Sequence, residues 1–547
     1  MRQPRERTWA RQRPAILSEA DTRQAIRLIE ALAALSEPDL RAVERLLRQY
    51  TRADGKFAKD QLVAVYREQV AAGARPHDPA LLRRLQMKPV RTLSGVATVT
   101  VLTKPFPCPG ECIFCPTDVR MPKSYLHDEP GAQRAEAHAF DPYETTAGRL
   151  RALENIGHPT DKVELLILGG TWSYYPTDYQ AWFVKRCLDA LNGFEAATLE
   201  EAQRINAGAA RRNVGLVIET RPDYIDAAEL RRLRRYGVTK VQLGAQSLDD
   251  RILDLNRRGH TVEQTRRAVD LLRAAGFKLH LHWMPNLLGA TPASDRTDFA
   301  RLWSDPGLRP DELKIYPCSL LAEAELTAWH ARGEYTPYTD AELIELIADC
   351  LAETPRFVRV NRVIRDIPAG HVVAGSTLSN LREVVERRLA ATGRSSQDIR
   401  AREVRGGRVE AEALTLDEIR YATRGGEERF LSLTTPEDRL AGFLRLSLPT
   451  PEARAWHDLE ALDAAAIIRE VHVYGPVAPL QPRTHGQDGD AQHSGAGARL
   501  IAAAEARARA AGYARLAVIS AIGTRDYYIR HGFADDKLYL TKPLTVH

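Results

Sequence analysis

The stretch VATVTVLTKPFPCPGECIFCP, residues 96–116, joins a β-rich run to a loop that carries Cys108, Cys112 and Cys115. Valine and threonine alternate before the loop, which is typical of a strand, and the prolines and glycine that follow favour its end. Five comparable runs lie further along the chain: VELLILGG, VGLVIETRP, KVQLGAQS, KLHLHWMP and ELKIYPCS. Between them lie amphipathic segments such as TVEQTRRAVDLLRAAGF, with apolar residues at helical spacing.

Repeated strand–helix units predict an α/β fold with a parallel sheet and right-handed crossovers. Six units form either an open sheet or a partial (β/α)6 barrel. In both arrangements the functional residues are expected at the C-terminal ends of the strands. We divide the chain into a helical region 1–85, the strand–helix region 86–320, a helical connector 321–402 and a C-terminal domain 403–547 of strands, a Gly-rich turn and helices.

Composition excludes few function classes. With 44% hydrophobic and 27% charged residues the chain resembles ordinary globular proteins. No apolar run approaches the roughly 20 residues that cross a bilayer, and no apolar segment follows the basic start as in a secretory signal. We therefore expect a cytoplasmic protein with reduced cysteines and no membrane partner. The net charge of +5 permits a nucleic-acid partner without requiring one.

The three clustered cysteines are one fewer than structural zinc normally takes. The other cysteines, at positions 187, 318 and 350, are scattered. A [4Fe–4S] cluster is held by thiolates, so three cysteines leave one iron open to a small chelating molecule. C-x3-C-x2-C directly after a first strand is the signature of radical S-adenosylmethionine (SAM) enzymes, in which SAM takes that iron. The alternative is a zinc knuckle with a distant fourth ligand.

The ends of the later strands carry small or polar residues. Gly169, Gly170 and Thr171 follow the second strand, where glycines let a ligand such as SAM approach the backbone, and Glu219 ends the third, where it would accept from the SAM ammonium. His280 and His282 alternate with a leucine, so both point to one face of the sheet, into the barrel. They are either hydrogen-bonded core histidines or residues that face a ligand, and both interpretations stay open.

The C-terminal domain contains a second cofactor motif. Gln492, Gly495 and Gly497 form Q-x-x-G-x-G directly before a good helix, the pyrophosphate-binding turn of GCN5-related acetyltransferases. The preceding run REVHVYG would offer open backbone groups to the pantetheine arm of acetyl-CoA. Tyr527 and Tyr528 follow at the distance where these enzymes often place a tyrosine beside the acyl group. The alternative is a plain turn that begins a helix.

Together with these motifs, the segments MPKSYL, EPGAQRA, FDPYETT, GHPTDKVELLILGGTW and KIYPC resemble the catalytic third subunit of Elongator in its stand-alone prokaryotic form. The resemblance covers nearly the whole chain from about residue 85. It implies a tRNA carboxymethyluridine synthase that uses a [4Fe–4S] cluster, SAM and acetyl-CoA. A radical made from SAM takes hydrogen from the acetyl methyl group, the carbon adds to C5 of the wobble uridine, and thioester hydrolysis leaves a 5-carboxymethyl group.

The resemblance also implies roles for single residues. Cys108, Cys112 and Cys115 match the cluster ligands, and Lys162 matches a position near acetyl-CoA, at the seam where we expect the two domains to close face to face. The other implied acetyl-CoA contacts are Glu470, Val471, His472, Val473, Ala496, Gly497, Ala498 and Tyr528. Tyr316 is a candidate for stacking on the wobble uridine.

The implied partner is the anticodon stem-loop of tRNA, with arginines of region 1–85, RRLRRY at 231–236 and Lys123 as candidate phosphate contacts. Such charge runs are more often only solvated helix faces. The electron donor is unknown, and the sequence is compatible with a monomer or a homodimer.

One departure from the family concerns zinc. Many relatives carry a cysteine group that, with the cysteine of KIYPC, resembles a zinc site. Here Ser396, Asp398 and Ala401 stand in those places, and Cys318 is left without thiolate partners. We therefore predict no structural zinc.

Two other functions remain to be separated from the leading one. The first is a protein lysine acetyltransferase with a merely structural cluster domain, which needs only acetyl-CoA and a general base. The second is a non-catalytic tRNA-binding scaffold that keeps a degenerate cluster.

Overall fold

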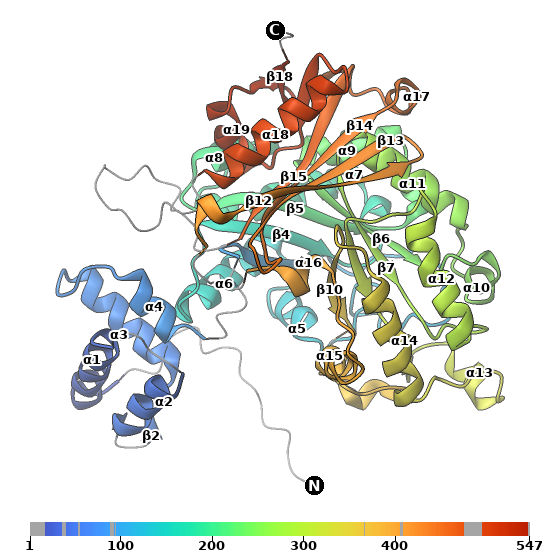
Figure 1. Cartoon of the computed structure of the whole chain (residues 1–547). Helices are drawn as coiled ribbons and strands as arrows, with labels where there is room; N and C mark the ends of the chain where they lie inside the picture. Colours follow the sequence, from blue (N-terminus) through green and yellow to red (C-terminus); the bar gives the residue numbers. More distant parts are fainter. Residues whose placement is uncertain are drawn as a thin grey trace.

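The computed structural model describes residues 17–35, 40–52, 55–87, 92, 94–365, 367–404, 409–474 and 495–544. Figure 1 shows a small helical unit set apart from a larger body, in which a C-terminal sheet packs across a first sheet. The predicted α/β fold is confirmed: a parallel sheet in a partial barrel is followed by a C-terminal domain with a mixed sheet.

The small unit contains α1 (Glu19–Ala33), α2 (Leu40–Gln49), α3 (Lys59–Ala71) and α4 (Pro79–Leu85). Its helices enclose a core of their own, which includes Leu28, Leu62 and Tyr66. A short hairpin, β1 (Thr51–Arg52) with β2 (Gly55–Lys56), lies between α2 and α3. The prediction of a purely helical region missed this hairpin, although an Asp-Gly pair favours such a turn.

The first sheet of the body is parallel throughout, in the order β10-β8-β7-β6-β5-β4-β3. Its strands are β3 (Ala97–Leu102), β4 (Lys162–Leu168), β5 (Arg212–Thr220), β6 (Lys240–Gln246), β7 (Lys278–Trp283), β8 (Glu312–Ile315) and β10 (Arg359–Val363). The first six are the predicted strands. The seventh, β10, comes from the predicted helical connector and extends the sheet beside β8.

Helices connect and cover these strands. They are α5 (Pro130–Ala137), α6 (Pro142–Asn155), α7 (Thr177–Asn192), α8 (Leu199–Gly208), α9 (Ala227–Tyr236), α10 (Asp250–Leu255), α11 (Val262–Ala274), α12 (Pro292–Ser304), α13 (Thr327–Ala331), α14 (Asp340–Glu353), α15 (Leu381–Ala391) and α16 (Ile399–Arg402). A small antiparallel pair, β9 (Leu320–Leu321) with β11 (Val372–Ala374), lies in the connector.

The C-terminal domain is a mixed sheet in the order β12-β13-β14-β15-β16-β18-β17. Its elements are β12 (Thr415–Thr423), β13 (Gly426–Thr434), β14 (Leu440–Pro449), α17 (Pro451–Arg454), β15 (Ala465–Val473), α18 (Ala496–Ala510), β16 (Arg515–Val518), α19 (Arg525–Arg530), β17 (Ala534–Asp536) and β18 (Tyr539–Pro543). Only β15 and β16 are parallel neighbours, and they pair over no more than Ala465–Ile468. Beyond that point the two strands diverge.

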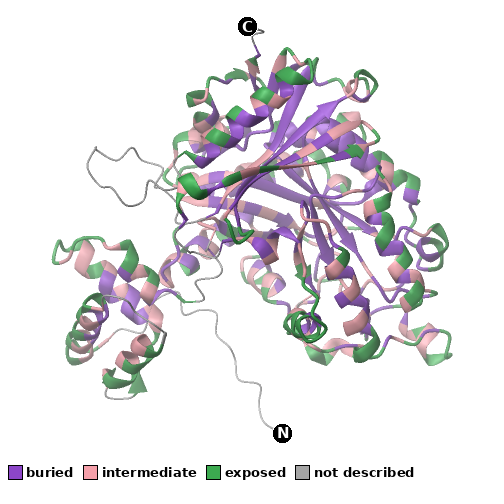
Figure 2. Cartoon of the chain, in the orientation of Figure 1, coloured by how far each residue is buried: buried purple, intermediate pink, exposed green. Residues whose placement is uncertain are grey.

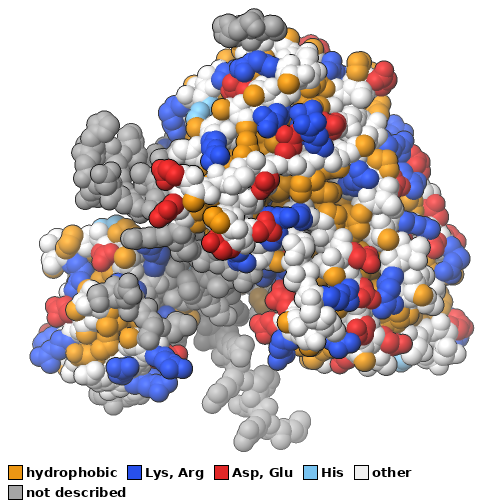
Figure 3. All heavy atoms as spheres, in the orientation of Figure 1, with side chains coloured by type: hydrophobic (Ala, Val, Ile, Leu, Met, Phe, Trp, Pro, Cys, Tyr) orange, Lys and Arg blue, Asp and Glu red, His pale blue; other side chains and the backbone are white. Residues whose placement is uncertain are grey.

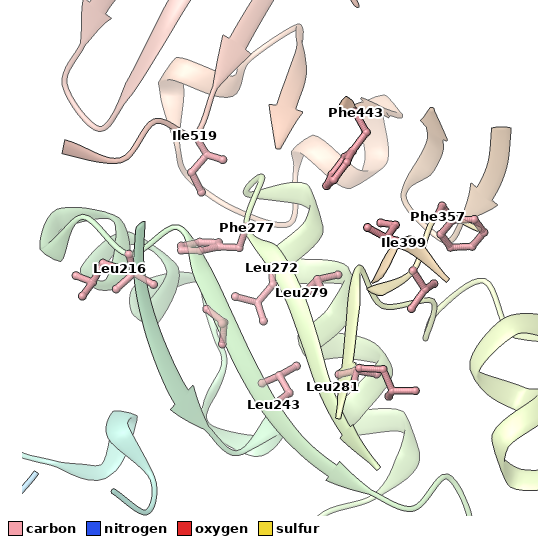
Figure 4. Packing of buried hydrophobic residues seen from close by; sticks show 14 of the residues in the cluster. Leu216, Leu243, Leu272, Phe277, Leu279, Leu281, Phe357, Ile399, Phe443 and Ile519 are labelled. Atoms are coloured by element: carbon pink, nitrogen blue, oxygen red, sulfur yellow. The ribbon is translucent and has the colours of Figure 1, made fainter. Parts of the chain in front are cut away.

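The two sheets of the body share one continuous core. Figure 2 shows most of their strands buried, apart from the outer strand β12, and Figure 4 shows Ile519 of the C-terminal domain above Phe277 of the barrel. The approach is close at Gly276, where a Cβ would lie 2.9 Å from Ile467 Cγ2. The C-terminal domain therefore packs directly against the end of the barrel where its strands begin.

Candidate functional site

The cysteine loop follows β3 and stands over the C-terminal ends of the strands. Ile113, inside the loop, is fully buried, and its N–H donates to the Asn256 carbonyl at 3.3 Å. The three cysteines are half-buried. Burial raises the pKa of Cys115 to about 12, so this thiol stays protonated unless a metal binds it.

Basic side chains surround this loop. Arg258 Nη1 lies 3.6 Å from Cys112 Sγ, and Arg221 Nη1 lies 2.3 Å from the place where Gly110 would carry a Cβ. Within the described residues, Arg221 Nη1, Arg258 Nε and both ring nitrogens of His260 are buried without a hydrogen-bond partner. Thiols with unpartnered cationic donors beside them fit an anionic iron–sulfur cluster, which takes hydrogen bonds to its sulfurs.

Gly169 and Gly170 follow β4 with φ of +133° and +79°, conformations that side chains rarely adopt. A Cβ on Gly169 would lie 2.0 Å from Thr103 Oγ1, so this turn tolerates only glycine. Thr171 is next, with its hydroxyl 3.5 Å from Cys108 Sγ. The structure thus brings these three predicted residues beside the cysteine loop.

A cavity of about 450 Å³, the cluster-side cavity, opens beneath the cysteine loop. Its polar walls include Cys115, Glu219, His282, Lys314, Tyr316 and Arg365. Burial raises the pKa of Glu219, with Lys314 and Arg365 opposing that shift. The Tyr316 ring lies 5.6 Å from that of His282, so the tyrosine and the strand-end residues line one space.

His280 differs from His282. The two rings lie 5.5 Å apart on the inner face of β7, as the alternation predicts. His282 Nε2 is 2.9 Å from Gln242 Oε1, whereas neither ring nitrogen of His280 has a hydrogen-bond partner among the described residues. His280 Nδ1 is 3.1 Å from Glu312 Oε2 without the alignment of a hydrogen bond. His280 does not line the cluster-side cavity.

In the C-terminal domain the divergence of β15 from β16 frees one backbone edge of Glu470, Val471, His472 and Val473. Helix α18 begins at Ala496, after Gly495, and includes Gly497 and Ala498. Gln492 lies outside the described residues. The arrangement matches the open edge and helix N-terminus predicted for a pantetheine arm and a pyrophosphate.

A second cavity, of about 410 Å³, lies where the C-terminal domain meets the barrel, and we call it the seam cavity. From the C-terminal domain it is lined by Glu470, His472 and Tyr528 among others, and from the barrel by the first residues of several strands. Lys278 reaches across to Glu470 and also lies 2.6 Å from Glu312. Lys162 begins β4 two residues before Glu164, which lines this cavity, and burial lowers the lysine pKa.

Several residues of these sites were missed by the sequence analysis. They are Arg221, Lys240, Gln242, Arg258, Lys278, Glu312, Lys314, Arg365, Arg445 and Arg469. Part of the signal was present, because Lys240, Lys278 and Glu312 are charged residues at the first positions of buried strands. Nothing in the sequence indicated which distant partners they meet.

At the positions where relatives carry the zinc cysteines, the side chains bond to protein groups instead. Asp398 is fully buried at the start of α16, and its carboxylate accepts from the Val360 N–H at 3.0 Å and the Ala401 N–H at 3.2 Å. Ser396 donates to the same carboxylate at 2.9 Å. Within the described ranges, no group of three or more metal-binding side chains could hold an ion. The expected absence of zinc stays a prediction for metal analysis.

Gly497 offers a test of the acetyl-CoA site. A Cβ there would lie 2.2 Å from the Tyr527 hydroxyl, so Gly497→Ala would push the ring aside at the start of α18. We expect acetyl-CoA affinity to fall about 10-fold by calorimetry, roughly 1.4 kcal/mol. Gly208→Ala is the matched control, because nothing lies within 4 Å of its Cβ. Equal affinity in Gly497→Ala and the control would remove Tyr527 and α18 from the site.

Comparison with known proteins bears on both halves of the body. Residues 107–297 match the family model of the radical SAM superfamily, and residues 310–391 match the radical SAM C-terminal domain. The chain is 42% identical to a tRNA uridine(34) acetyltransferase of Dehalococcoides mccartyi, over 83% of this chain and 99% of the relative. It is 34% identical to human Elongator complex protein 3, over 94% and 95% of the two chains.

A solved structure agrees with these relatives. It is the archaeal Methanocaldococcus infernus Elp3 with its first 46 residues deleted, which superposes with a TM-score of 0.71 at 36% identity. It covers 82% of this chain, and the match extends over 99% of that chain. As for membranes, the part of the chain that is described contains no helix with the length and apolar character needed to cross one.

Proposed function

The chain belongs to the family of tRNA uridine(34) acetyltransferases related to Elongator complex protein 3, and on this premise we propose that it modifies the wobble uridine of tRNA with the acetyl group of acetyl-CoA. The proposed product is a 5-carboxymethyl group on C5 of the base. The observation that carries the proposal is the pair of cavities at opposite ends of one barrel. One lies below three cysteines and the other against the open edge of β15.

The residues present fit the proposed cofactors. Cys108, Cys112 and Cys115 would hold a [4Fe–4S] cluster, with Arg221 and Arg258 donating to its sulfurs. When bound, the cluster and SAM supply the power to remove hydrogen from an unreactive carbon.

At the strand ends, the Gly169–Gly170 turn would admit the amino-acid part of SAM to the backbone, beside Thr171. Glu219 would accept from its ammonium group. His282 and Lys314 line the rest of the cavity, and Tyr316 presents an aromatic face on which a uracil ring could stack.

On the other side, the free edge of Glu470–Val473 would bind the pantetheine arm, and the N-terminus of α18, Ala496–Ala498, the pyrophosphate. Tyr528 is buried and lines the seam cavity, where it would contact the acyl end. Lys162 would lie close to acetyl-CoA at the edge of the seam cavity.

For tRNA we propose contacts along the N-terminal unit. Arg23 and Arg27 of α1 and Arg41, Arg45 and Arg48 of α2 are exposed, and Figure 3 shows basic side chains on the outer face of this unit. Phosphate contacts of this kind are salt-dependent and blind to sequence. The anticodon stem-loop would then reach the barrel from the side of this unit.

The decisive experiment is mass spectrometry of a target tRNA after incubation with anaerobically reconstituted protein, SAM and acetyl-CoA labelled in the methyl carbon. We expect label on C5 of uridine 34, with a mass matching a carboxymethyl group. Label on protein lysines alone would support the acetyltransferase alternative. Absence of SAM cleavage under reductant, with tRNA still bound, would support the scaffold alternative.

A further inference from the structure

The cluster-side cavity and the seam cavity occupy the same barrel lumen, one behind the other. On β3, Thr98 lines the seam cavity and Thr100 the cluster-side cavity; on β4 the corresponding pair is Glu164 and Leu166. On β8 it is Glu312 and Lys314. Residues two apart share one face of a strand, so the walls of the two cavities are continuous.

The separation between the cavities is short. Two residues along a strand span about 6.6 Å, which leaves room for a single layer of side chains. On β5, β6 and β7 that layer consists of Val217, Gln242 and His280, which line neither cavity and are each at most 2% exposed. We call these three residues the partition. On β3, β4 and β8 no residue of the same strand face stands between the lining of one cavity and that of the other.

Two of the partition residues differ in how they are bonded. Gln242 Oε1 accepts from Lys314 Nζ at 2.5 Å and lies 2.9 Å from His282 Nε2, both on the cluster side. His280 Nδ1 lies 3.1 Å from Glu312 Oε2, whereas Nε2 has no hydrogen-bond partner within the described residues, and burial keeps the ring neutral by lowering its pKa to about 3. The buried Nε2 therefore has no partner in this state, which costs stability and leaves it able to bond a group that enters the lumen.

We propose that the barrel lumen is a passage, and that the acetyl end of the thioester crosses the partition at His280 to enter the cluster-side cavity. The inference rests on the proposed function and adds the route by which its two substrates meet. A slender, uncharged acetyl thioester is the group that can cross one side-chain layer, whereas a nucleobase attached to its ribose and phosphates cannot. Thr98 and Thr100 mark the path on its least obstructed wall.

The test places one thiol on each side of the partition. Thr98→Cys and Thr100→Cys each replace a hydroxyl with a thiol and remove one methyl group. Each full-length, cluster-loaded variant is treated anaerobically with bromoacetyl-CoA. The thiolate sulfur bonds to the bromoacetyl CH2 carbon and bromide leaves. Peptide mass spectrometry locates the product, a readout independent of SAM cleavage and tRNA modification. Native Cys187 and Cys350 are buried internal controls.

Both engineered thiols are expected to react at least ~10-fold faster with bromoacetyl-CoA than with bromoacetamide, because binding of the CoA part raises the effective concentration of the reagent. Excess CoA is expected to suppress both reactions. Adding His280→Phe, which fills the partition, is expected to slow labelling at position 100 and spare position 98. Labelling at 98 without labelling at 100 would overturn the passage and leave the proposed function standing.

Two further outcomes also count against the passage. Equal reaction of position 100 with bromoacetamide, unaffected by CoA, would mean entry from the cluster-side mouth and would overturn the route. No labelling at either position, while calorimetry still detects CoA binding, would overturn both the passage and the placement of the acyl end in the seam cavity. No CoA binding by calorimetry would instead refute the proposed function.

Discussion

Alanine in place of Cys108, Cys112 or Cys115 is expected to abolish iron–sulfur binding and, with it, tRNA modification. Each thiolate holds one iron, so losing one opens a second coordination position and the cluster is no longer retained. We expect the three residues to act as a unit, so that each single variant loses activity on the order of 1,000-fold and the triple variant little more. Iron analysis and visible absorption measure the cluster, and mass spectrometry measures the tRNA.

The chain provides matched controls for this experiment. Cys187 in α7 and Cys350 in α14 are buried, and their alanine variants remove a thiol far from the loop. These are expected to keep full iron content and to modify tRNA. A cysteine-loop variant that stayed active without iron would refute the cluster, and stoichiometric zinc in the wild-type protein that is lost in the variants would favour the zinc knuckle.

The second large effect is expected at the domain interface. Arg469 and Asp311 are both fully buried and joined by two contacts of 2.7 Å, and Arg469 also binds Glu428 at 2.7 Å. Removing one partner of such a pair leaves an uncompensated buried charge, which costs about 3–5 kcal/mol. We expect Arg469→Met or Asp311→Asn to lower the free energy of unfolding by that amount in denaturant titrations.

The contribution of Asp311 to stability depends on pH, in a direction set by the shift of its pKa. The neighbouring arginines hold the Asp311 pKa below its usual value, despite burial that opposes them. The carboxylate therefore stabilises the fold above the unfolded pKa of about 3.9, and that stability is lost as the pH falls toward the folded pKa. The difference between wild type and Asp311→Asn should shrink below pH about 4.

An exposed ion pair serves as a control, because it shows what the loss of a charge alone does to stability. Glu334 pairs with Arg332 on the surface, and Glu334→Gln is expected to leave stability almost unchanged. If Asp311→Asn were equally silent, the pair of Asp311 with Arg469 would not contribute to holding the two domains together.

The first six strands of the barrel could be predicted from the sequence, because each is a largely apolar run that ends in a small or polar residue. Strand β10 was missed since Arg359, Asn361 and Arg362 interrupt its apolar pattern. Arg359 and Asn361 line the seam cavity, and Arg362, although exposed, lines the cluster-side cavity. A local pattern records that a residue is polar, but not that the lumen of a barrel will enclose it.

The candidate site divides in the same way. The cysteine loop and the strand-end glycines are local features, so their spacing alone indicates a ligand. The network of Asp311, Arg445, Arg469 and Glu470 joins residues more than a hundred positions apart. A charged residue in a strand run has no recognisable partner until both chain segments are folded. The seam expected at Lys162 was therefore placed by resemblance, while the residues that bind the domains together emerged only from the structure.

The shared core has a consequence for dissecting the chain into pieces. A fragment beginning near residue 403 would expose Phe443, Ile467 and Ile519 to water together with several unpaired charges, and would be prone to aggregate. The amino-terminal helices, which enclose Leu28 and Tyr66 by themselves, lack this liability. We therefore expect the protein to tolerate removal of its N-terminal helices. The C-terminal domain should be produced together with the barrel.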